Sequence, residues 1–434
     1  MERAAARALA QETLRRCDLL ATYSEEPGRL TRTFLSTAMR EVQDRVAGWM
    51  EGAGMTVRRD GVGNVIGRLG GGPDASGTFL LGSHLDTVPD AGKYDGILGV
   101  LLAIAAVEVL GRGGAGGLPC AVEVAGFAEE EGVRFGVPFL GSRAVAGAYD
   151  AALLARTDSG GITVAEAIRA TGGDPAALLG AGPAYAPGEL TGYLEVHIEQ
   201  GPVLESLGQP LGAVSTIASQ CRLRLTFEGR AGHAGTTPMR QRRDALAGAA
   251  ALVVDVERYA RAVPDLVATV GQVQVSPGAA NVIPGRVGVS LDVRHPEDET
   301  RRRAAARLVR RAGELARRRC LALTVQEELD QPAVACDALL RRRLVEAAQA
   351  LGYGAPPVVS GAGHDAMVMA ALAPVAMLFL RSPGGVSHHP DEAVLADDVA
   401  AALEVVVAFL QHLPDLREAA GAPAAPTSPS QADR

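Results

Sequence analysis

The chain contains 434 residues, of which 47% are hydrophobic and 21% charged, and its formal net charge is -8 at pH 7. This length allows two or more domains with a sizeable buried core. The net acidity argues against a general nucleic-acid-binding surface, which needs a basic footprint. Five cysteines without a CxxC spacing predict reduced thiols and a cytoplasmic protein. Because the chain has neither a signal-peptide core nor a long apolar run, we also expect no membrane partner.

The first part of the chain predicts an α/β domain. Residues 1–50 are interpreted as helical, and β-like runs broken by glycine follow in MTVRRDGVGNVIGRL and TFLLGSHLDT. GILGVLLAIAAVEVL (96–110) predicts a buried helix, and CAVEVAGFA predicts a central parallel strand because both of its faces are apolar. Strands that alternate with helices indicate a doubly wound, mostly parallel sheet. We expect this domain to span 1–212 and to resume over 331–415.

The middle of the chain predicts an inserted α+β domain, placed at 213–330. From RLRLTFEG onward the segments follow the order β-α-β-β-α-β, which is typical of a split-βαβ sandwich with one open sheet face or edge. The Arg-rich segment 301–319 favours an amphipathic surface helix over a nucleic-acid patch. Helices near 337–351 and 395–412 enclose the strand PVAMLFLR, and the Ala/Pro/Ser-rich tail 416–434 predicts disorder.

Three consecutive glutamates, Glu129, Glu130 and Glu131, come directly after the β-like run CAVEVAGFA. Like charges side by side repel, so the run is either a solvated acidic turn or a site where a cation absorbs the charge. His84 and Asp86 follow the strand-like FLLG and lie two residues apart. This spacing suits a metal ligand and the carboxylate that orients it.

Further histidines and carboxylates fall in strand-end loops. Asp95 lies just before the predicted buried helix, where a helix cap is the simpler interpretation, although beside His84 it could bridge two cations. His197 ends the run YLEVH, and His388 and His389 lie in GGVSHHPDEAV. Because sites in open α/β sheets gather at the carboxyl ends of strands, these segments predict a centre of His and carboxylate ligands, which zinc and manganese accept.

These motifs resemble those of the dinuclear metal-dependent amidohydrolases of the hydantoinase/carbamoylase group. That group contains allantoate amidohydrolases, N-carbamoyl-L-amino acid hydrolases and β-ureidopropionases, and it is related to metal-dependent aminoacylases and carboxypeptidases. The resemblance covers about residues 10–412. The matching segments, in chain order, are GSHLDTVPDAGKYDGILGV, AEEEGVRFGVPFLGSRAVAG, HIEQGPVLE, GHAGTTPM, NVIPG, DVRH, SGAGHDAM and SHHPDE.

The resemblance implies two divalent metal ions per subunit, with zinc as the first choice and manganese as the alternative. The implied ligands are His84, Asp95, Glu131, His197 and His388. Asp95 would bridge both ions, Glu130 would be the catalytic acid/base, and Asp86 would orient His84. His389 falls on the variable position of the family motif S-H-x-P-x-E, and Glu129 receives no role and is expected to face away from the metals.

The resemblance also implies a homodimer formed through the inserted domain, which would carry contacts to a small ureido substrate. His233 would polarise the scissile carbonyl, in its own subunit or in the partner's site. Gln220, Asn281 and Arg294 would hold the ureido and carboxylate groups of the substrate. The planar fork of Arg294 suits a carboxylate because it can bind both oxygens.

Among these activities, the combination of AGKYDG with RFGVPFLGSRAVAG is most similar to allantoate amidohydrolases. We therefore expect cleavage of a ureido C–N bond of allantoate, with release of ammonia and carbon dioxide. An N-carbamoyl-L-amino acid hydrolase or a β-ureidopropionase is the alternative. An aminoacylase or dipeptidase is less favoured because HIEQGPVLE and GHAGTTPM fit the ureido-cleaving branch. A non-catalytic binding relative is less favoured because the ligand set is complete.

Overall fold

The computed structural model describes residues 2–72, 75–112 and 118–413. The tail 416–434, for which disorder is predicted, lies outside this range. The chain divides into two compact units. The first unit comprises Met1–Ser215, Cys336–Val358 and His364–Arg434, and the second comprises Thr216–Ala335 and Val359–Gly363.

A mixed β-sheet forms the centre of the first unit. Its strands are β1 (Thr56–Arg59), β2 (Val65–Leu69), β3 (Thr78–His84), β4 (Ala121–Phe127), β5 (Leu190–Ile198), β6 (Leu211–Ile217), β14 (Val334–Ala335), β15 (Pro357–Ser360) and β16 (Val375–Leu380). In the described part of the chain their order is β1-β2-β4-β3-β5-β16-β6-β14, and β15 pairs with β6. The four central strands, β4, β3, β5 and β16, are mutually parallel. The predicted α/β class with a mostly parallel central sheet is confirmed.

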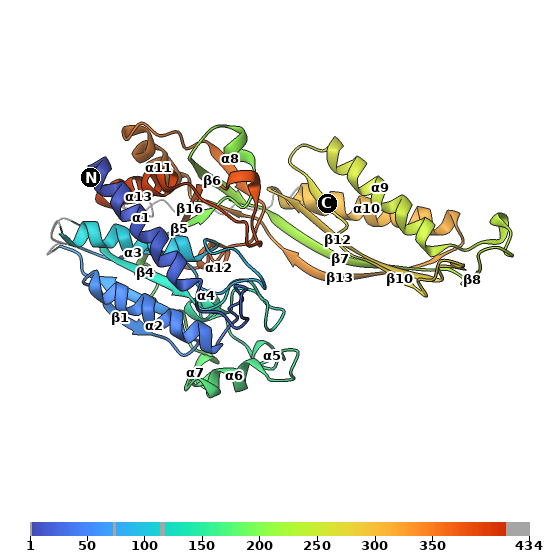
Figure 1. Ribbon diagram of the computed structural model, residues 1–434, viewed down its shortest axis with the longest axis horizontal. Helices are drawn as coiled ribbons and strands as arrows, with labels where there is room; N and C mark the ends of the chain where they lie inside the picture. The colour runs from blue at the N-terminus through green and yellow to red at the C-terminus, as the bar shows by residue number, and fades with distance from the viewer. Residues whose placement is uncertain (1, 73–74, 113–117, 414–434) are drawn as a thin grey trace, which may run out of the picture. The chain divides into compact units, whose positions relative to one another are not determined.

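Several helices of the first unit, among them α3, α11 and α13, pack against strands of this sheet. The helices of this unit are α1 (Arg3–Leu20), α2 (Thr37–Gly52), α3 (Ile97–Arg112), α4 (Leu140–Val145), α5 (Ala151–Leu154), α6 (Val164–Ala170), α7 (Pro175–Leu178), α8 (Val203–Ser206), α11 (Ala338–Ala350), α12 (Ala366–Met369) and α13 (Ala396–Gln411), with a short turn η3 (Pro383–Gly385). α3 lies against α1 and α13 (Figure 1). Its side chains are apolar almost all round, which is why it is buried, as the sequence predicted.

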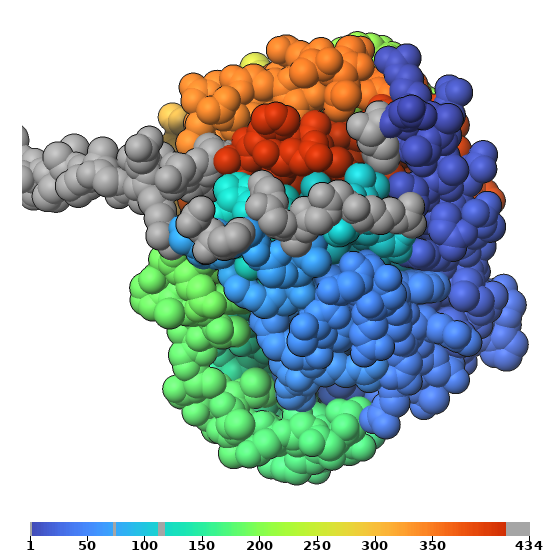
Figure 2. All heavy atoms as spheres, turned by 90° about the vertical axis from the view of Figure 1, so that its left-hand side faces the viewer, coloured from blue at the N-terminus to red at the C-terminus, as the bar shows by residue number. Residues whose placement is uncertain are grey.

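The first fifty residues form two helices, so the prediction of continuous helix over 1–50 was wrong. α1 ends at Leu20 and α2 begins at Thr37. Pro27 lacks a backbone N–H and Gly28 adopts a φ of +77°, and both features prevent a helix from continuing through the connection. Ser36 caps α2 by accepting a hydrogen bond from the backbone N–H of Met39. Figure 2 shows both helices, in two shades of blue, on the outer surface of the first unit.

The second unit is an antiparallel sheet covered by two helices. Its elements are β7 (Ser219–Glu228), β8 (Gly232–His233), η2 (Met239–Gln241), α9 (Ala245–Ala262), β9 (Val267–Thr269), β10 (Val273–Ser276), β11 (Val282–Ile283), β12 (Arg286–His295), α10 (Asp298–Arg318) and β13 (Ala322–Gln331). The sheet order is β10-β12-β7-β13, with β9 also paired to β12 (Figure 1). Every second residue of β12 is buried, which matches one covered face. The main elements follow the expected β-α-β-β-α-β order.

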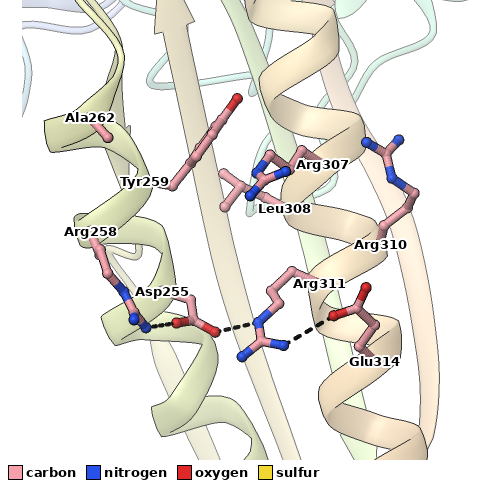
Figure 3. Close-up of a pocket in the computed structure, with 9 residues that line it drawn as sticks. All are labelled: Asp255, Arg258, Tyr259, Ala262, Arg307, Leu308, Arg310, Arg311 and Glu314. Carbon is pink, nitrogen blue, oxygen red and sulfur yellow. Dashed lines mark hydrogen bonds and ion pairs between the residues drawn. The ribbon is translucent and has the colours of Figure 1, made fainter.

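The Arg-rich segment forms the amphipathic helix α10, as predicted. Its buried face carries Ala304, Leu308 and Leu315. A hollow of about 450 Å³ lies between α9 and α10, and charged residues line it (Figure 3). One ion pair crosses between the two helices, because Arg311 of α10 bonds Asp255 of α9, and Arg311 also bonds Glu314 of its own helix. Among the described residues, no helix is long and apolar enough to cross a membrane.

Candidate metal centre

The site forms where neighbouring parallel strands of the first unit end. β3 ends at His84, which is in register with Phe127 at the end of β4. His197 lies one residue before the end of β5, beside Phe379 of β16. Because parallel strands present their carboxyl ends at one edge of a sheet, the loops that follow β3 and β4 meet His197 there. The pairing of the strands therefore brings His84 and His197 close together, although more than a hundred residues separate them in the sequence.

One group of possible metal ligands consists of His84, Asp95 and His197. Nε2 of His197 lies 3.1 Å from Oδ1 of Asp95, and Nε2 of His84 lies 3.7 Å from the same oxygen. The two imidazole Nε2 atoms are 3.4 Å apart. All three side chains are buried. Three ligand atoms therefore converge on one point that is closed to bulk water.

A second group consists of Asp95, Glu131 and His388. Nε2 of His388 lies 3.1 Å from Oδ2 of Asp95 and 3.6 Å from Oε1 of Glu131. The two oxygens of Asp95 thus face different groups, with Oδ1 toward the histidines of the first group and Oδ2 toward His388. The sequence predicts that Asp95 bridges two cations, and a bridging carboxylate requires this arrangement. His389 faces Asp391 instead.

The donor set fits a pair of divalent cations. Oδ1 of Asp95 and Oε1 of Glu131 are buried and accept no hydrogen bond from the described residues. Buried carboxylate oxygens without a partner are costly, and a cation removes that cost. The helix-cap interpretation of Asp95 is wrong, because within the described chain its carboxylate bonds no backbone N–H of α3. The solvated-turn interpretation of the glutamate run is also wrong, because Glu129 and Glu130 are buried.

The loop that carries the three glutamates is shaped by two carboxylates. Asp86 accepts hydrogen bonds from the backbone N–H groups of Glu130, at 2.9 Å, and Glu131, at 3.2 Å. Glu129 accepts from the backbone N–H groups of Gly132 and Leu140. Glu129 belongs to none of the ligand groups found among the described residues, yet it closes this loop. The motif alone assigned Glu129 no role.

Asp86 also lies beside His84, although chiefly through its backbone. Nδ1 of His84 is 3.1 Å from the carbonyl oxygen of Asp86 and 3.4 Å from its carboxylate oxygen Oδ1. A bond to the carbonyl fixes the tautomer in which Nε2 is free to bind a metal. The space around this ring is tight, because a Cβ on Gly96 would lie 2.5 Å from the His84 ring. The role of Asp86 as an orienting residue stays a prediction.

Burial and crowding shift the titration of the acidic side chains. Burial, followed by the charge of Glu131, raises the pKa of Glu130 well above its usual value. Burial and the charge of Asp95 raise the pKa of Glu131 to about 7. A raised pKa lets the Glu130 carboxyl hold a proton more readily than an exposed glutamate does, which a general acid requires.

The pKa values of the histidines His84, His197 and His388 are raised and that of Asp95 is lowered, so all four side chains favour their charged forms. The hydrogen bond to Asp95 raises the pKa of His388 to about 9. Burial opposes charge on Asp95, but the nearby imidazoles of His197, His388 and His84 hold the pKa of this carboxyl well below its usual value. Without a metal, these protonated histidines balance part of the charge that a cation would balance.

Sequence reasoning missed several residues of this centre. Nε2 of Gln200 donates to Oδ2 of Asp95 at 2.9 Å and lies 3.3 Å from Nε2 of His388. Glu195 and His364 form a further group with His197. Gln200 and His364 lie in the motifs HIEQGPVLE and SGAGHDAM, and Glu195 comes two residues before His197 on β5. For Gln200 and Glu195 the available signal was their closeness in sequence to the predicted ligand His197, and for His364 it was its place in a family motif.

The substrate contacts predicted in the second unit fall into two pairs. Gln220 of β7 and Arg294 of β12 are opposite one another in the sheet, and both donate to Asp292. His233 of β8 is opposite Val282. The backbone N–H of Ala234, the residue after His233, donates to the carbonyl of Asn281. Within the described residues, no hydrogen bond joins one pair to the other. The roles of these four residues stay predictions.

Comparison with known proteins agrees with this site. A model of Peptidase family M20/M25/M40 matches residues 80–412, and the chain belongs to this family. The chain is 41% identical to an allantoate deiminase of Arabidopsis thaliana over 93% of this chain and 82% of that protein. It is 40% identical to an N-carbamoyl-L-amino acid amidohydrolase of Geobacillus stearothermophilus over 89% of this chain and 94% of that protein.

The solved structures lead to the same group. A hydantoinase/carbamoylase family amidase from Burkholderia multivorans superposes with a TM-score of 0.84 at 33% identity, covering 92% of this chain and 97% of that one. The resemblance inferred from the motifs is therefore confirmed at the level of the family.

Proposed function

We propose that this protein is a metal-dependent amidohydrolase that cleaves a ureido C–N bond, with allantoate as its substrate. One observation carries the proposal: two groups of His and carboxylate ligands share Asp95, and the buried Glu130 lies beside them. The identity to allantoate deiminases supports the choice of substrate. N-carbamoyl-L-amino acids are the second candidate class, because a relative with that activity is 40% identical.

The first group, His84, Asp95 and His197, would hold one ion, and Asp95, Glu131 and His388 would hold the other. A ureido carbon is a poor electrophile because two nitrogen lone pairs feed its carbonyl. Divalent ions, when bound, supply Lewis acidity that polarises such a carbonyl and makes water more acidic. Mixed imidazole and carboxylate donors suit zinc first and manganese second.

The chain's own chemistry centres on Glu130. Its carboxylate would take a proton from the attacking water and return it to the departing nitrogen, first as general base and then as general acid. Asp86 would keep Glu130 in place by accepting its backbone N–H. The products from allantoate would be the shortened ureido compound, carbon dioxide and ammonia.

We further propose that the second unit supplies the substrate contacts. Arg294 donates three N–H groups to Asp292 and to the carbonyl of Gly361, which fixes its guanidinium and leaves other N–H groups for a substrate carboxylate. His233 is exposed, and its Nδ1 accepts a bond from Gly235, so Nε2 would carry the proton that stabilises a developing oxyanion. Gln220 and Asn281 would hold the ureido group.

The second unit would also form a homodimer. β13 is an edge strand that pairs only with β7 in the described sheet, and most of its side chains are exposed. An open edge of ten residues is a template for pairing with a second copy. Light scattering of the purified protein tests this proposal, and a monomer at micromolar concentration would contradict it.

The test of the function is a substrate panel with metal-loaded protein. Ammonia release would be followed with allantoate, N-carbamoyl-L-amino acids, N-carbamoyl-β-alanine and a dipeptide, the last by amine release. We expect the highest kcat/KM with allantoate. A higher value with N-carbamoyl-L-amino acids would move the substrate to the second class. Absence of ammonia from every ureido compound, with two metals bound, would overturn the proposal.

A further inference from the structure

Glu392 is a buried glutamate that stands outside the ligand groups yet contacts the segments of two ligands. It is 4% exposed. Its oxygen Oε1 accepts hydrogen bonds from the backbone N–H groups of Tyr94, at 2.9 Å, and Asp95, at 3.1 Å. Its other oxygen, Oε2, accepts from the hydroxyl of Ser387 at 2.9 Å. All three bonds reach residues at, or next to, Asp95 and His388.

We propose that Glu392 is a positioning residue that sets the spacing between Asp95 and His388 and thereby forms the second metal site. The inference rests on the proposed function for the identity of that site. Asp95 lies in the turn before α3, and His388 lies in the loop before α13, almost three hundred residues later in the chain. In the described residues, the Glu392 carboxylate bonds both segments directly.

Two further observations show that the carboxylate fits closely. A Cβ on Gly92 would lie 2.4 Å from Oε1 of Glu392, so the turn before Asp95 can approach only because residue 92 is glycine. The backbone N–H of Glu392 also donates to the carbonyl of His389, which folds the loop back beneath its own carboxylate. His388 itself adopts a φ of 55°, which needs support from its surroundings.

Neither a salt bridge nor simple packing accounts for the contacts of Glu392. It forms no ion pair with an arginine or lysine in the described chain, so it is not part of a structural salt bridge. A simple packing role would not require two acceptor oxygens to be divided between two ligand segments. Loss of a residue that orients metal ligands typically weakens metal affinity by about 10- to 100-fold.

The experiment compares Glu392→Ala, Glu392→Gln and Gly92→Ala with the unchanged protein. Each metal-free protein would be titrated with Co²⁺, following the visible absorption of the bound ion and the number of ions retained per subunit. In Glu392→Ala we expect the second Co²⁺ to bind about 10- to 100-fold more weakly while the first is retained. Glu392→Gln keeps an acceptor for both N–H groups, so its second affinity should remain close to that of the unchanged protein.

Glu404→Ala is the matched control. Glu404 is a buried glutamate, 5% exposed, that accepts a hydrogen bond from the Tyr353 hydroxyl, and within the described residues it bonds no ligand segment. It should keep both Co²⁺ affinities, even if its melting temperature falls. Should Glu392→Ala fail to fold, Gly92→Ala decides, because its Cβ displaces the Glu392 carboxylate and should weaken the second ion in the same way.

The outcomes separate this inference from the proposed function. If the unchanged protein binds two Co²⁺ ions and both Glu392→Ala and Gly92→Ala bind the second with unchanged affinity, the role of Glu392 is wrong. If Glu392→Ala folds, an unchanged affinity for its second Co²⁺ ion is by itself enough to show that the role of Glu392 is wrong. If the unchanged protein binds no Co²⁺, the proposed function fails, and the role of Glu392 fails with it.

Discussion

Carboxylates in two regions of this molecule are neutralised in different ways. In the hollow between α9 and α10, Asp255 is paired with both Arg258 and Arg311 (Figure 3). At the strand ends of the first unit, the described residues give Asp95 and Glu131 only histidines as charged partners and give Glu130 no ion pair. A buried carboxylate that lacks an arginine is expensive to keep. This difference indicates that the strand-end site of the first unit is built to bind a cation from outside the chain.

The strand β4 shows the same contrast between its two ends. Glu123, near its start, is bonded by Arg58 and Arg68. Burial opposes its charge, but Tyr185 and these arginines lower the pKa of Glu123 below its usual value. Beyond the end of the strand, burial raises the pKa of Glu130 well above its usual value. Arginines thus accompany the carboxylate near the start of β4, and among the described residues none pairs with Glu130 beyond its end.

The largest effect is expected for Glu130→Gln. The amide keeps the shape of the side chain but cannot accept or return a proton, so kcat should fall by about 100- to 10,000-fold. Metal content should remain at two ions per subunit, measured by mass spectrometry of the protein after dialysis. Substantial activity in a fully metal-loaded variant would remove Glu130 from the catalytic role.

Removing the shared ligand should affect both ions. Asp95→Ala deletes the carboxylate whose oxygens face His197 and His388. We expect at most one ion per subunit after dialysis and loss of ureido hydrolysis. His388→Ala is the comparison, because it removes a ligand of one group only and should retain the ion held by His84 and His197. Two tightly held ions in Asp95→Ala would contradict a bridging carboxylate.

The stabilisation that added metal gives should increase with pH. Without metal, the folded protein holds a proton on Glu131 up to a pKa of about 7 and on His388 up to a pKa of about 9. Both values are raised on folding, so the stability that these protons contribute is lost as pH rises through them. A metal replaces those protons, and its advantage therefore grows over that range.

Melting temperatures of chelated and metal-loaded protein between about pH 6 and pH 9 test this linkage. The difference between the two should widen as pH rises. Asp255→Asn, which lies in the second unit, should leave that difference unchanged at every pH. A difference that stays constant or narrows would show that these groups do not release protons to the metal.

The smallest effect is expected in the arginine-paired region. Asp255→Asn removes the charge that Arg258 and Arg311 share, and these partners are largely or partly exposed. Such pairs contribute about 1 kcal/mol or less to the free energy of unfolding. Urea denaturation should show a loss of that size, with kcat and metal content unchanged. Glu257→Gln, on the exposed face of α9, provides a control for the lost charge.

The sequence predicted the ligand candidates because each of them follows a recognisable strand or opens a motif. His84 and His197 could be placed at one edge once their strands were interpreted as parallel. The contacts of Glu129, Gln200 and Glu392 could not be predicted in this way, because they depend on how loops from distant parts of the chain fold against one another. A single sequence does not determine those loop conformations.

Because a single sequence does not determine how loops fold, the structure also differs from the sequence-based expectation elsewhere in the fold. The helical periodicity of α1 and α2 was visible in the sequence, but it did not reveal the turn at Pro27 and Gly28 between them. In the second unit, Gln220 and Arg294 are neighbours because their strands pair in register, whereas His233 lies on the separate β8–β11 ladder. Motif order along the chain does not reveal that division.

A metal titration of chelated protein tests the central claim most directly. Zn²⁺, or Mn²⁺ in a parallel series, would be added in steps while bound metal per subunit and ammonia release from allantoate are measured in the same samples. We predict that activity rises with bound metal and reaches its plateau at two ions per subunit. Full activity in protein that retains no metal, or no ammonia at two bound ions, would contradict the account.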